Sequence, residues 1–529
     1  METDVLVIGA GAAGMYAAIA AARGGARVLL VDRSLIGRGG ATVMAQMTVA
    51  VAVGEEEPDH WEHHLADTLK AGRGLCDPAL SQLLCEDGPD CIREMDGWGI
   101  GWARRDGHMA QVHAPGHDRK RCVYVDFLNT GPAVSKTLRA RVQRMPEIRR
   151  VGDLLVTDIA VRDGVCVGAH AVHVSTGRAV PLAAKATIIA TGGLTRLYAR
   201  NSASINMGGD GYALALRAGA ELIDMEFVQF FPIGHLAPRL VGMDPIMWDP
   251  FRYKLGGRLL NSDGREFLPE AGKYTSARDI ATYGILKEVE AGRGSPHGGA
   301  WLSFQHCGEA ELRSAFGPVI DRLAANGIDL TRQNIEVAPI AHYHMGGIRT
   351  DTDMRTSVPH LFAAGEAVGG ANGANRLSGN AITEAVTFGR RAGARAAALA
   401  SQTAMPALAS ARLDAKRPDL NPAAAIVELQ RVMNRDVGPL RTAAGLQRAL
   451  AHIQGLDVPL PAPHEGLDAE WVDIHDLRNM RLVAECVTRA ALAREESRGA
   501  HQRDDFPEGD TRWQRRQAIR LEGNTCKLS

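Results

Sequence analysis

Residues 3–32 read TDVLVIGAGAAGMYAAIAAARGGARVLLVD. This order predicts a strand, a glycine turn, an alanine-rich helix and a second strand. Gly9 permits the turn, Gly11 lets a pyrophosphate approach the backbone, and Gly14 allows close helix–strand packing. Asp32 lies 18 residues beyond Gly14, where a carboxylate can accept a hydrogen bond from a ribose hydroxyl. GxGxxG alone is a weak signal, but the complete unit predicts dinucleotide binding.

Two further segments extend this prediction. Small residues at 39–42 suit a loop that wraps against a cofactor, since bulky side chains would keep backbone N–H groups away from it. The apolar strand 186–190 is followed by Thr191-Gly192-Gly193. This glycine turn gives the sheet a second backbone edge at which a cofactor could bind. No other GxGxxG precedes this point, so an enzyme that also binds a nicotinamide dinucleotide is disfavoured.

Length, charge and cysteine spacing exclude several classes of protein. A chain of 529 residues predicts two or three domains. Lysine plus arginine (60) nearly equals aspartate plus glutamate (61), so no overall field attracts nucleic acid or an anionic membrane. The eight cysteines form no C-x-x-C pair, which argues against an internal iron–sulfur cluster, a zinc ribbon or an attached haem. Any further redox centre is expected on another chain.

The sequence also predicts where the protein works. The first apolar strand begins close to Met1, which leaves no room for a signal peptide, and no apolar run reaches the roughly 20 residues of a membrane helix. We therefore expect a cytoplasmic protein without a membrane span. His108, His113 and His117 have spacings found in some metal sites, but no cysteine or acidic ligand accompanies them regularly, so a polar loop is favoured and no metal site is predicted.

Motifs in a fixed order then extend over almost the whole chain. The chain resembles the succinate dehydrogenase/fumarate reductase flavoprotein family, which also includes L-aspartate oxidase and the flavin subunit of adenylylsulfate reductase. Besides residues 5–32 and 190–193, the segments that carry the resemblance are 208–211, 218–220, 226–229, 256–257, 261–264, 277–279, 341–347, 364–366, 373–377, 379–380 and 496–501.

The resemblance implies an α/β fold, with a Rossmann-like FAD-binding domain, an inserted α+β capping domain and a C-terminal helical domain. The expected ranges are 1–232 and 338–400 for the two parts of the FAD-binding domain, 233–337 for the cap, and 401–529 for the helical domain and tail. On its own terms, the sequence shows an alanine- and proline-rich linker at 401–422 and helical spacing at 423–455. The polar stretch 504–529 is expected to be an extended surface segment.

The family's FAD contacts can be carried over residue by residue. Asp32 is expected at the adenosine ribose, Glu366 at a ribityl or ribose hydroxyl, and the helix that opens at Asn380 near the flavin O2. Ala41 stands where related dehydrogenases place the histidine that attaches FAD covalently, so FAD is expected to bind noncovalently, with a potential that disfavours succinate oxidation. The implied cofactor-binding set is Gly9, Gly11, Ala13, Gly14, Asp32, Arg33, Ser34, Arg38, Gly39, Gly40, Ala41, Thr42, Ala45, Gln46, Ala190, Thr191, Gly192, Asp210, Glu366, Asn380, Ala381 and Ile382.

The resemblance also implies the chemistry and the catalytic residues. The family moves a hydride between flavin N5 and one carbon of a C–C bond beside a carboxylate. His342 and Arg376 match the family's substrate-binding histidine and arginine, and Arg278 matches the arginine considered to deliver the proton. Because the pKa of arginine exceeds about 12, a second carboxylate clamp stays open as the role of Arg278.

Departures from the family pattern predict a different substrate. Where fumarate and succinate enzymes read F-H-P-T-G, residues 230–234 place Phe231 and Ile233 at the histidine and threonine positions. Leu255 replaces the glutamate of the supposed proton relay. Losing two donors to a carboxylate costs several kcal/mol of binding. The expected small-molecule substrate therefore has one carboxylate and an apolar end, and is not succinate or fumarate.

Three functions follow from these residues. The favoured one is the flavoprotein subunit of an oxidoreductase that exchanges electrons with a ferredoxin-like iron–sulfur subunit. The second is a self-sufficient fumarate reductase or an enzyme similar to L-aspartate oxidase, which would need the second carboxylate site. The third is an electron-transfer flavoprotein without its own substrate, which the retention of Arg278, His342 and Arg376 disfavours.

Overall fold

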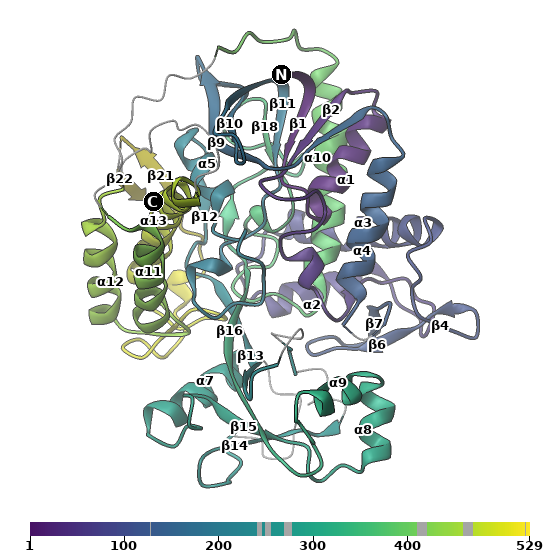
Figure 1. Ribbon diagram of the computed structural model, residues 1–529, viewed down its shortest axis with the longest axis vertical. Helices are drawn as coiled ribbons and strands as arrows, with labels where there is room; N and C mark the ends of the chain where they lie inside the picture. The colour runs from purple at the N-terminus through teal and green to yellow at the C-terminus, as the bar shows by residue number, and fades with distance from the viewer. Residues whose placement is uncertain are drawn as a thin grey trace.

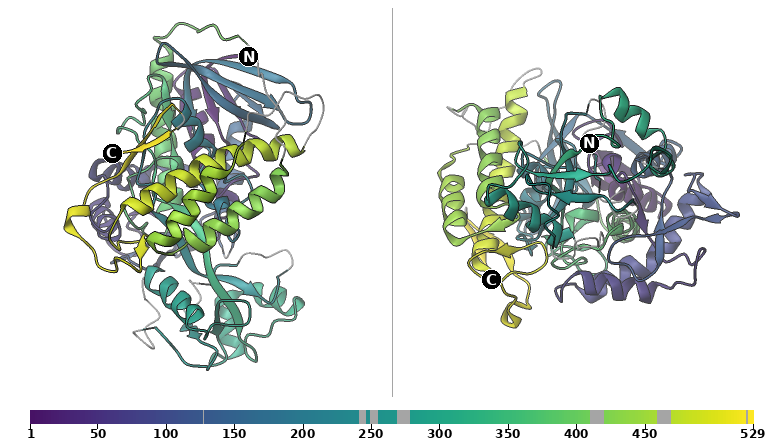
Figure 2. Two further views of the ribbon diagram at one scale, coloured as in Figure 1. Left: turned by 90° about the vertical axis from the view of Figure 1, so that its left-hand side faces the viewer. Right: turned by 90° about the horizontal axis from the view of Figure 1, so that it is seen from below.

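A computed structural model of the chain describes residues 1–126, 128–240, 246–248, 255–268, 278–409, 420–458, 469–523 and 525–529, without the side chains of residues 278 and 279. A large lobe carries the main sheet, and a smaller lobe hangs from it on strands β13 and β16 (Figure 1). Helices α11, α12 and α13 run along one side of the large lobe (Figure 2).

The expected nucleotide-binding unit is present at the N-terminus. It consists of β1 (Glu2–Ile8), α1 (Ala12–Arg23) and β2 (Val28–Val31). Residues 5–8 and 28–31 are buried because these strands lie inside the seven-stranded sheet, whose order is β8-β2-β1-β11-β10-β9 with β18 joined to β11. The other strands are β8 (Ile148–Val151), β9 (Leu154–Arg162), β10 (Val165–His173), β11 (Ala179–Ile189) and β18 (Leu361–Ala363). Parallel pairing of β2, β1, β11 and β18 confirms the Rossmann-like class.

Helix α10 (Asn380–Ala400) packs across α1 on one face of this sheet (Figure 1). A Cβ atom added at Gly389 or Gly393 would lie 2.4 Å or 2.1 Å from the carbonyl oxygens of Ala13 and Ala17. The two glycines and the alanines of α1 are therefore needed for the close approach of the helices. The neighbouring helices are α2 (Trp61–Ala71), α3 (Pro78–Gly97), α4 (Thr130–Gln143) and α5 (Asp210–Arg217).

The small lobe, which we call the cap, has its own sheet and core. Its strands are β13 (Val228–Ala237), β14 (Arg258–Leu260), β15 (Ala300–Ser303) and β16 (Ile335–His344), and its helices are α7 (Arg278–Glu290), α8 (Glu309–Phe316) and α9 (Val319–Ala325). Trp248, Phe304 and Phe316 pack ring to ring in this core, with centroids 5.6–6.1 Å apart. The boundaries expected near 232 and 338 fall inside β13 and β16, and the four domain ranges remain a prediction.

The C-terminal part contains the expected helices and, in its tail, a β-hairpin that was not expected. Helices α11 (Pro422–Asp436), α12 (Ala443–Gly455) and α13 (Ala469–Ala493) confirm the helical module. The tail is not an extended surface segment: β21 (Ala518–Glu522) and β22 (Thr525–Leu528) form a hairpin. β21 pairs with β12 (Leu222–Ile223), which pairs with β17 (Gly347–Ile348) on its other side, and Ile519 and Cys526 of the hairpin are buried. The sequence of the tail alone could not reveal this distant partner.

Short elements complete the chain. They are η1 (Thr42–Met44), β3 (Val49–Ala50), β4 (Arg104–Arg105), β5 (His108–Met109), β6 (Gln111–His113), β7 (Lys120–Val123), η2 (Thr195–Leu197), β17 (Gly347–Ile348), η3 (Gly365–Ala367), β19 (Leu440–Arg441), β20 (Gln502–Arg503) and η4 (Thr511–Trp513). In the described parts of the chain, no helix combines the length and the apolar character needed to cross a membrane.

Candidate active site

A cavity of about 740 Å³ lies where the carboxyl ends of β1 and β11 meet the cap. Ligands of open α/β sheets bind at this edge. Many residues expected at the cofactor line it: Gly11, Ala13, Gly40, Ala41, Thr42, Ala45, Gln46, Ala190, Thr191, Gly192, Glu366, Ala381 and Ile382. His342, Arg376 and Phe231 line the same cavity. The structure therefore brings most of the expected cofactor residues together with two of the three expected catalytic residues.

The glycine turn shapes one end of the cavity. Gly9 has a φ of +102°, and a Cβ there would lie 2.4 Å from the carbonyl oxygen of Ala190. Only glycine fits this left-handed position without strain. Gly14 meets the Gly9 carbonyl in the same way, at 1.9 Å. Because neither glycine lines the cavity, their part is to bring α1 and its N-terminal N–H groups up to its wall.

Asp32 is fixed at the end of β2. Its carboxylate accepts hydrogen bonds from the backbone N–H of Ala10 at 2.8 Å and from the N–H and hydroxyl of Ser34 at 2.8 and 2.7 Å. Ser34 also accepts from the side chain of Asn206 at 3.1 Å. These contacts join the turn after β1 to the loop after β2, although Asp32, Ser34, Gly39 and the exposed Arg38 do not line the cavity.

Arg33 and Asp210 have side chains that face the helical module. The Arg33 guanidinium lies 2.6 Å from Asp476 of α13 and 3.2 Å from Asp210. Asp210 also accepts from Asn479 of α13 at 2.9 Å. Their side chains thus tie the loop after β2 and helix α5 to helix α13.

Two glutamates lie close together, Glu366 half-buried in η3 and Glu384 buried on α10. Glu366 lines the cavity and accepts from the His344 N–H at 3.1 Å, and burial raises its pKa to about 8. Glu384 accepts from Tyr343 and Asn372, and burial raises its pKa to about 7. Asn380 is buried and bonded to His64 at 2.8 Å instead of lining the cavity. A ligand hydroxyl that donates to Glu366 would favour its charged form.

Arg376 and His342 occupy the cap side of the cavity. The guanidinium carbon of Arg376 lies 4.3 Å from the centre of the Tyr343 ring, and Gln229 donates to the Arg376 carbonyl at 3.0 Å. The His342 ring meets the Phe231 ring at 5.4 Å in a T-shaped arrangement. A guanidinium and an imidazole at one side of the cavity are donors suited to a carboxylate.

Two of the positions expected in the substrate pocket do not line the cavity, and a third cannot be placed. Arg278 begins α7, and its side chain lies outside the described part of the chain. Ile233 and Leu255 belong to the cap core and do not line the cavity. The register of β13 and β16 shifts between Phe231 and Gly234, so alternate residues of this strand do not share one face.

Several cavity residues were not expected from the sequence. Ser202, Met207, Met247 and Ala315 line it, as do Tyr124, Asp126 and residues 112–115 of the histidine-containing loop. Residues 112–115 sit in a glycine- and proline-rich stretch, which is a weak signal for a loop near a site. The other residues carry no local signal, because only the tertiary fold brings them to the cavity.

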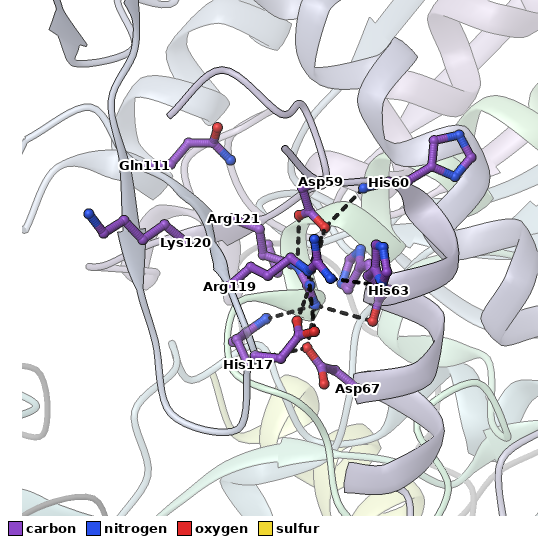
Figure 3. Close-up of polar contacts among 12 residues, drawn as sticks. Asp59, His60, His63, Asp67, Gln111, His117, Arg119, Lys120 and Arg121 are labelled. Carbon is purple, nitrogen blue, oxygen red and sulfur yellow. Dashed lines mark hydrogen bonds and ion pairs between the residues drawn. The ribbon is translucent and has the colours of Figure 1, made fainter. Parts of the chain in front are cut away.

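The histidine-containing segment, expected as a polar loop, contains the short strands β5, β6 and β7 with turns between them. It is held by a cluster of ion pairs around the buried Arg121 (Figure 3). Arg121 pairs with Asp59 at 3.0 Å, Asp67 at 2.5 Å and Asp118 at 2.6 Å. His117 bonds to the Ser378 carbonyl at 2.7 Å, and burial lowers its pKa to about 3. Among the described residues, no group of histidine, cysteine or acidic side chains could hold a metal ion. The loop thus acts as a fixed cavity wall.

Comparison with known proteins identifies the family of the chain. Residues 4–382 match the family model described as FAD binding domain, and residues 427–529 match the model described as fumarate reductase flavoprotein C-term. The chain belongs to the fumarate reductase/succinate dehydrogenase flavoprotein family. It is 34% identical to a protein of Methanothermobacter marburgensis that is named as one subunit of a CoM/CoB fumarate reductase, over 97% of this chain and 96% of that protein.

Members with other activities are equally similar. The chain is 35% identical to L-aspartate oxidase of Streptomyces coelicolor, over 98% of this chain and 92% of that protein. The solved structure of Mycobacterium smegmatis Sdh1 in complex with UQ1 superposes with a TM-score of 0.88 at 35% identity, covering 100% of this chain and 94% of that chain. The protein is an FAD-dependent oxidoreductase, and identity alone does not select its substrate.

The residues present fit FAD. The turn at Gly9 has no room for a Cβ, and the cavity runs from this turn past Thr42 and Gly192 to Glu366. A Cβ at Gly193 would lie 2.2 Å from Glu366 Oε1, so a glycine there is required for the carboxylate to reach its place. Backbone N–H groups at one end and an acceptor for hydroxyls at the other suit a dinucleotide.

Proposed function

We propose that this family member transforms a C–C bond beside the carboxylate of a substrate whose other end is apolar. The observation that carries the proposal is the Phe231 ring, which packs on His342 inside the cavity at 5.4 Å. Met247 and Ala315 extend this apolar wall from the cap. A second carboxylate placed against these side chains would lose its hydrogen bonds to water without replacement.

The cationic side of the cavity would bind the substrate's single carboxylate. Arg376 is 4% exposed and stacked on Tyr343, so its planar fork is held in one orientation. His342 would add a second donor, and Arg278 is proposed to act on the carbon beyond it, as a proton donor or as a further clamp. FAD, when bound, supplies the hydride chemistry. The protein residues bind, orient and polarise the substrate.

We further propose that electrons are exchanged with a ferredoxin-like iron–sulfur partner chain. All eight cysteines are free of disulfides, and seven of them are buried. The sulfur atoms of Cys486 and Cys526 lie 3.7 Å apart, but among the described residues no three cysteine, histidine or acidic side chains come together as a metal site. The name of the relative from Methanothermobacter marburgensis describes one subunit of a larger enzyme, which supports a partner chain. The similarity to L-aspartate oxidases favours, as the second candidate, an enzyme that needs no partner.

A substrate panel tests the proposal. With reduced methyl viologen as donor, the holoenzyme is expected to reduce trans-crotonate or trans-cinnamate at least tenfold better than fumarate, judged by kcat/KM. Ile233 lies in the cap core, so only the hydrogen-bond donor that is missing at Phe231 is expected to weaken the binding of fumarate. One hydrogen bond to a charged group is worth about 1.5–3 kcal/mol. Phe231→His should therefore raise kcat/KM for fumarate by about tenfold or more.

The neighbouring Phe230 provides the control. Its ring packs edge-on against Tyr198 at 5.0 Å and does not line the cavity, so Phe230→Leu should leave the preference unchanged. Fumarate reduction by the wild-type enzyme at rates above those of both enoates would overturn the proposed substrate class. Oxidation of L-aspartate with oxygen as acceptor would select the second candidate.

A second prediction concerns how FAD is held. Ala41 lines the cavity but has no nucleophilic side chain, so FAD is expected to bind without a covalent bond. After acid precipitation of the purified protein, all yellow colour should appear in the supernatant, measured by absorbance near 450 nm. Flavin that stays in the washed pellet would show a covalent link through another residue.

A further inference from the structure

Ser202 contacts the expected substrate-binding histidine. Its hydroxyl lies 2.7 Å from Nδ1 of His342, and both residues line the cavity. Ser202 is 6% exposed, so water does not compete freely for this hydrogen bond. Within the described part of the chain, the Ser202 hydroxyl makes this hydrogen bond and no other.

The backbone holds Ser202 in place beside β16. The Ala341 N–H donates to the Arg200 carbonyl at 3.0 Å, and the Ser202 N–H donates to the Ala341 carbonyl at 3.0 Å. These two bonds form a parallel bridge between Asn201 and Ala341, the residue directly before His342. The backbone pairing with β16 therefore positions the serine hydroxyl beside the imidazole.

Contacts with Phe231 and Ser202 restrain the imidazole ring. Phe231 meets the ring with an interplanar angle of 65°, and the Ser202 hydroxyl lies within hydrogen-bond distance of Nδ1. A ring restrained in this way loses little further entropy when it binds a ligand. Such restraint is what a residue that orients a substrate requires.

The hydrogen bond links the Ser202 hydroxyl to the position of the imidazole proton. If Nδ1 carried the proton, the Ser202 oxygen would accept from it, and the hydroxyl hydrogen would point into the cavity that Ser202 lines. If Ser202 donates to Nδ1, the proton of the neutral ring is on Nε2. His342 then presents an N–H donor, the group that a substrate carboxylate can accept from.

From this geometry we infer that Ser202 is a positioning residue, which holds His342 with Nε2–H as the donor to the substrate carboxylate. The inference rests on the proposed function, since it assumes that His342 binds the carboxylate. It predicts that Ser202 affects the substrate only through His342. Its effect should vanish when the imidazole is removed.

A double-mutant cycle tests this dependence. Dissociation constants for trans-crotonate are measured by flavin absorbance changes on the holoenzyme, and kcat and KM are measured with reduced methyl viologen. Ser202→Ala should weaken binding and lower kcat/KM about tenfold, and Ser202→Thr, which keeps the hydroxyl, should recover most of the loss. In the His342→Ala background, Ser202→Ala should change neither quantity by more than about twofold.

Ser81 supplies a matched control. It is also buried, at 0% exposure, but its hydroxyl donates to the Ala371 carbonyl at 2.7 Å and Ser81 does not line the cavity, so Ser81→Ala should leave kcat/KM unchanged. A tenfold loss from Ser202→Ala that persists in the His342→Ala background would overturn the inference, as would a single variant equal to wild type. If His342→Ala itself binds and reduces crotonate normally, the proposed function fails at that step, and the inference fails with it.

Discussion

Replacing Arg376 with lysine is expected to lower kcat/KM for the carboxylate substrate by about 10²- to 10³-fold while FAD stays bound. The arginine is buried, and its guanidinium lies 4.3 Å from the Tyr343 ring centre. A lysine ammonium cannot stack in this way or present two parallel donors to one carboxylate. A lost charge-assisted hydrogen bond together with the lost stacking amounts to about 3–4 kcal/mol, which corresponds to this decrease.

The measurement is steady-state reduction of the preferred enoate, together with the flavin absorbance of the purified variant. Arg390→Lys is the control, because Arg390 lies on α10 outside the cavity and pairs with Asp87 at 3.5 Å. It should retain wild-type kcat/KM. An Arg376→Lys enzyme within threefold of wild type would remove Arg376 from carboxylate binding.

The sequence predicted best those features that depend on local backbone geometry. Gly9 is required by its φ of +102° and by the approach of Ala190, and both constraints arise within one strand–turn–helix unit. Asp32 follows the second strand of the same unit. The periodicity of apolar residues in the C-terminal part was sufficient to predict α11 and α12 for the same reason.

Features that depend on distant contacts were not predictable. Ser202 reaches His342 across 140 positions of sequence, and its own segment is irregular. Arg33 was expected at the cofactor from the family resemblance, but its side chain pairs with Asp476, 443 positions away. A sequence motif predicts that a backbone segment lies near a site. It does not predict the contacts of a long side chain, because the partner residues come from distant parts of the folded chain.

The substrate pocket shows the same limit inside a single strand. Phe231 and Ile233 are two positions apart, so a regular strand would direct both side chains to one face. The register shift in β13 breaks this alternation, and only Phe231 reaches the cavity. The prediction of an apolar pocket therefore rests on one residue of β13 together with Met247 and Ala315 of the cap.

The C-terminal tail is fastened to the rest of the protein by Arg494, which is fully buried. Its guanidinium lies 2.6 Å from Glu226 and 2.9 Å from Glu496. It also donates to the backbone carbonyls of Trp513 at 2.8 Å and Arg515 at 3.0 Å. One cation thus joins the end of α13, the tail before β21, and the segment that leads into β13.

Arg494→Met is expected to reduce the free energy of unfolding by about 3–5 kcal/mol, because it leaves Glu226 buried without its cation and two carbonyls without donors. For a chain of this length that unfolds cooperatively, this corresponds to a fall in Tm of about 4 °C, measured by calorimetry of the holoenzyme. Arg494→Lys keeps a cation beside Glu226 but loses the carbonyl contacts, so a smaller fall is expected.

Arg512 gives the matched control, since it lies in the same tail, pairs with Asp510 at 2.6 Å and has a side chain that is 88% exposed. Arg512→Met should shift Tm by less than about 1 °C, because exposed ion pairs contribute little. Glu226 lies two residues before β13, the strand that carries Phe231, so loss of Arg494 should also raise KM for the enoate, whereas loss of Arg512 should not. An Arg494→Met protein with wild-type Tm and KM would show that the β12–β21 pairing and the contacts of Arg516 and Gln517 hold the tail without Arg494.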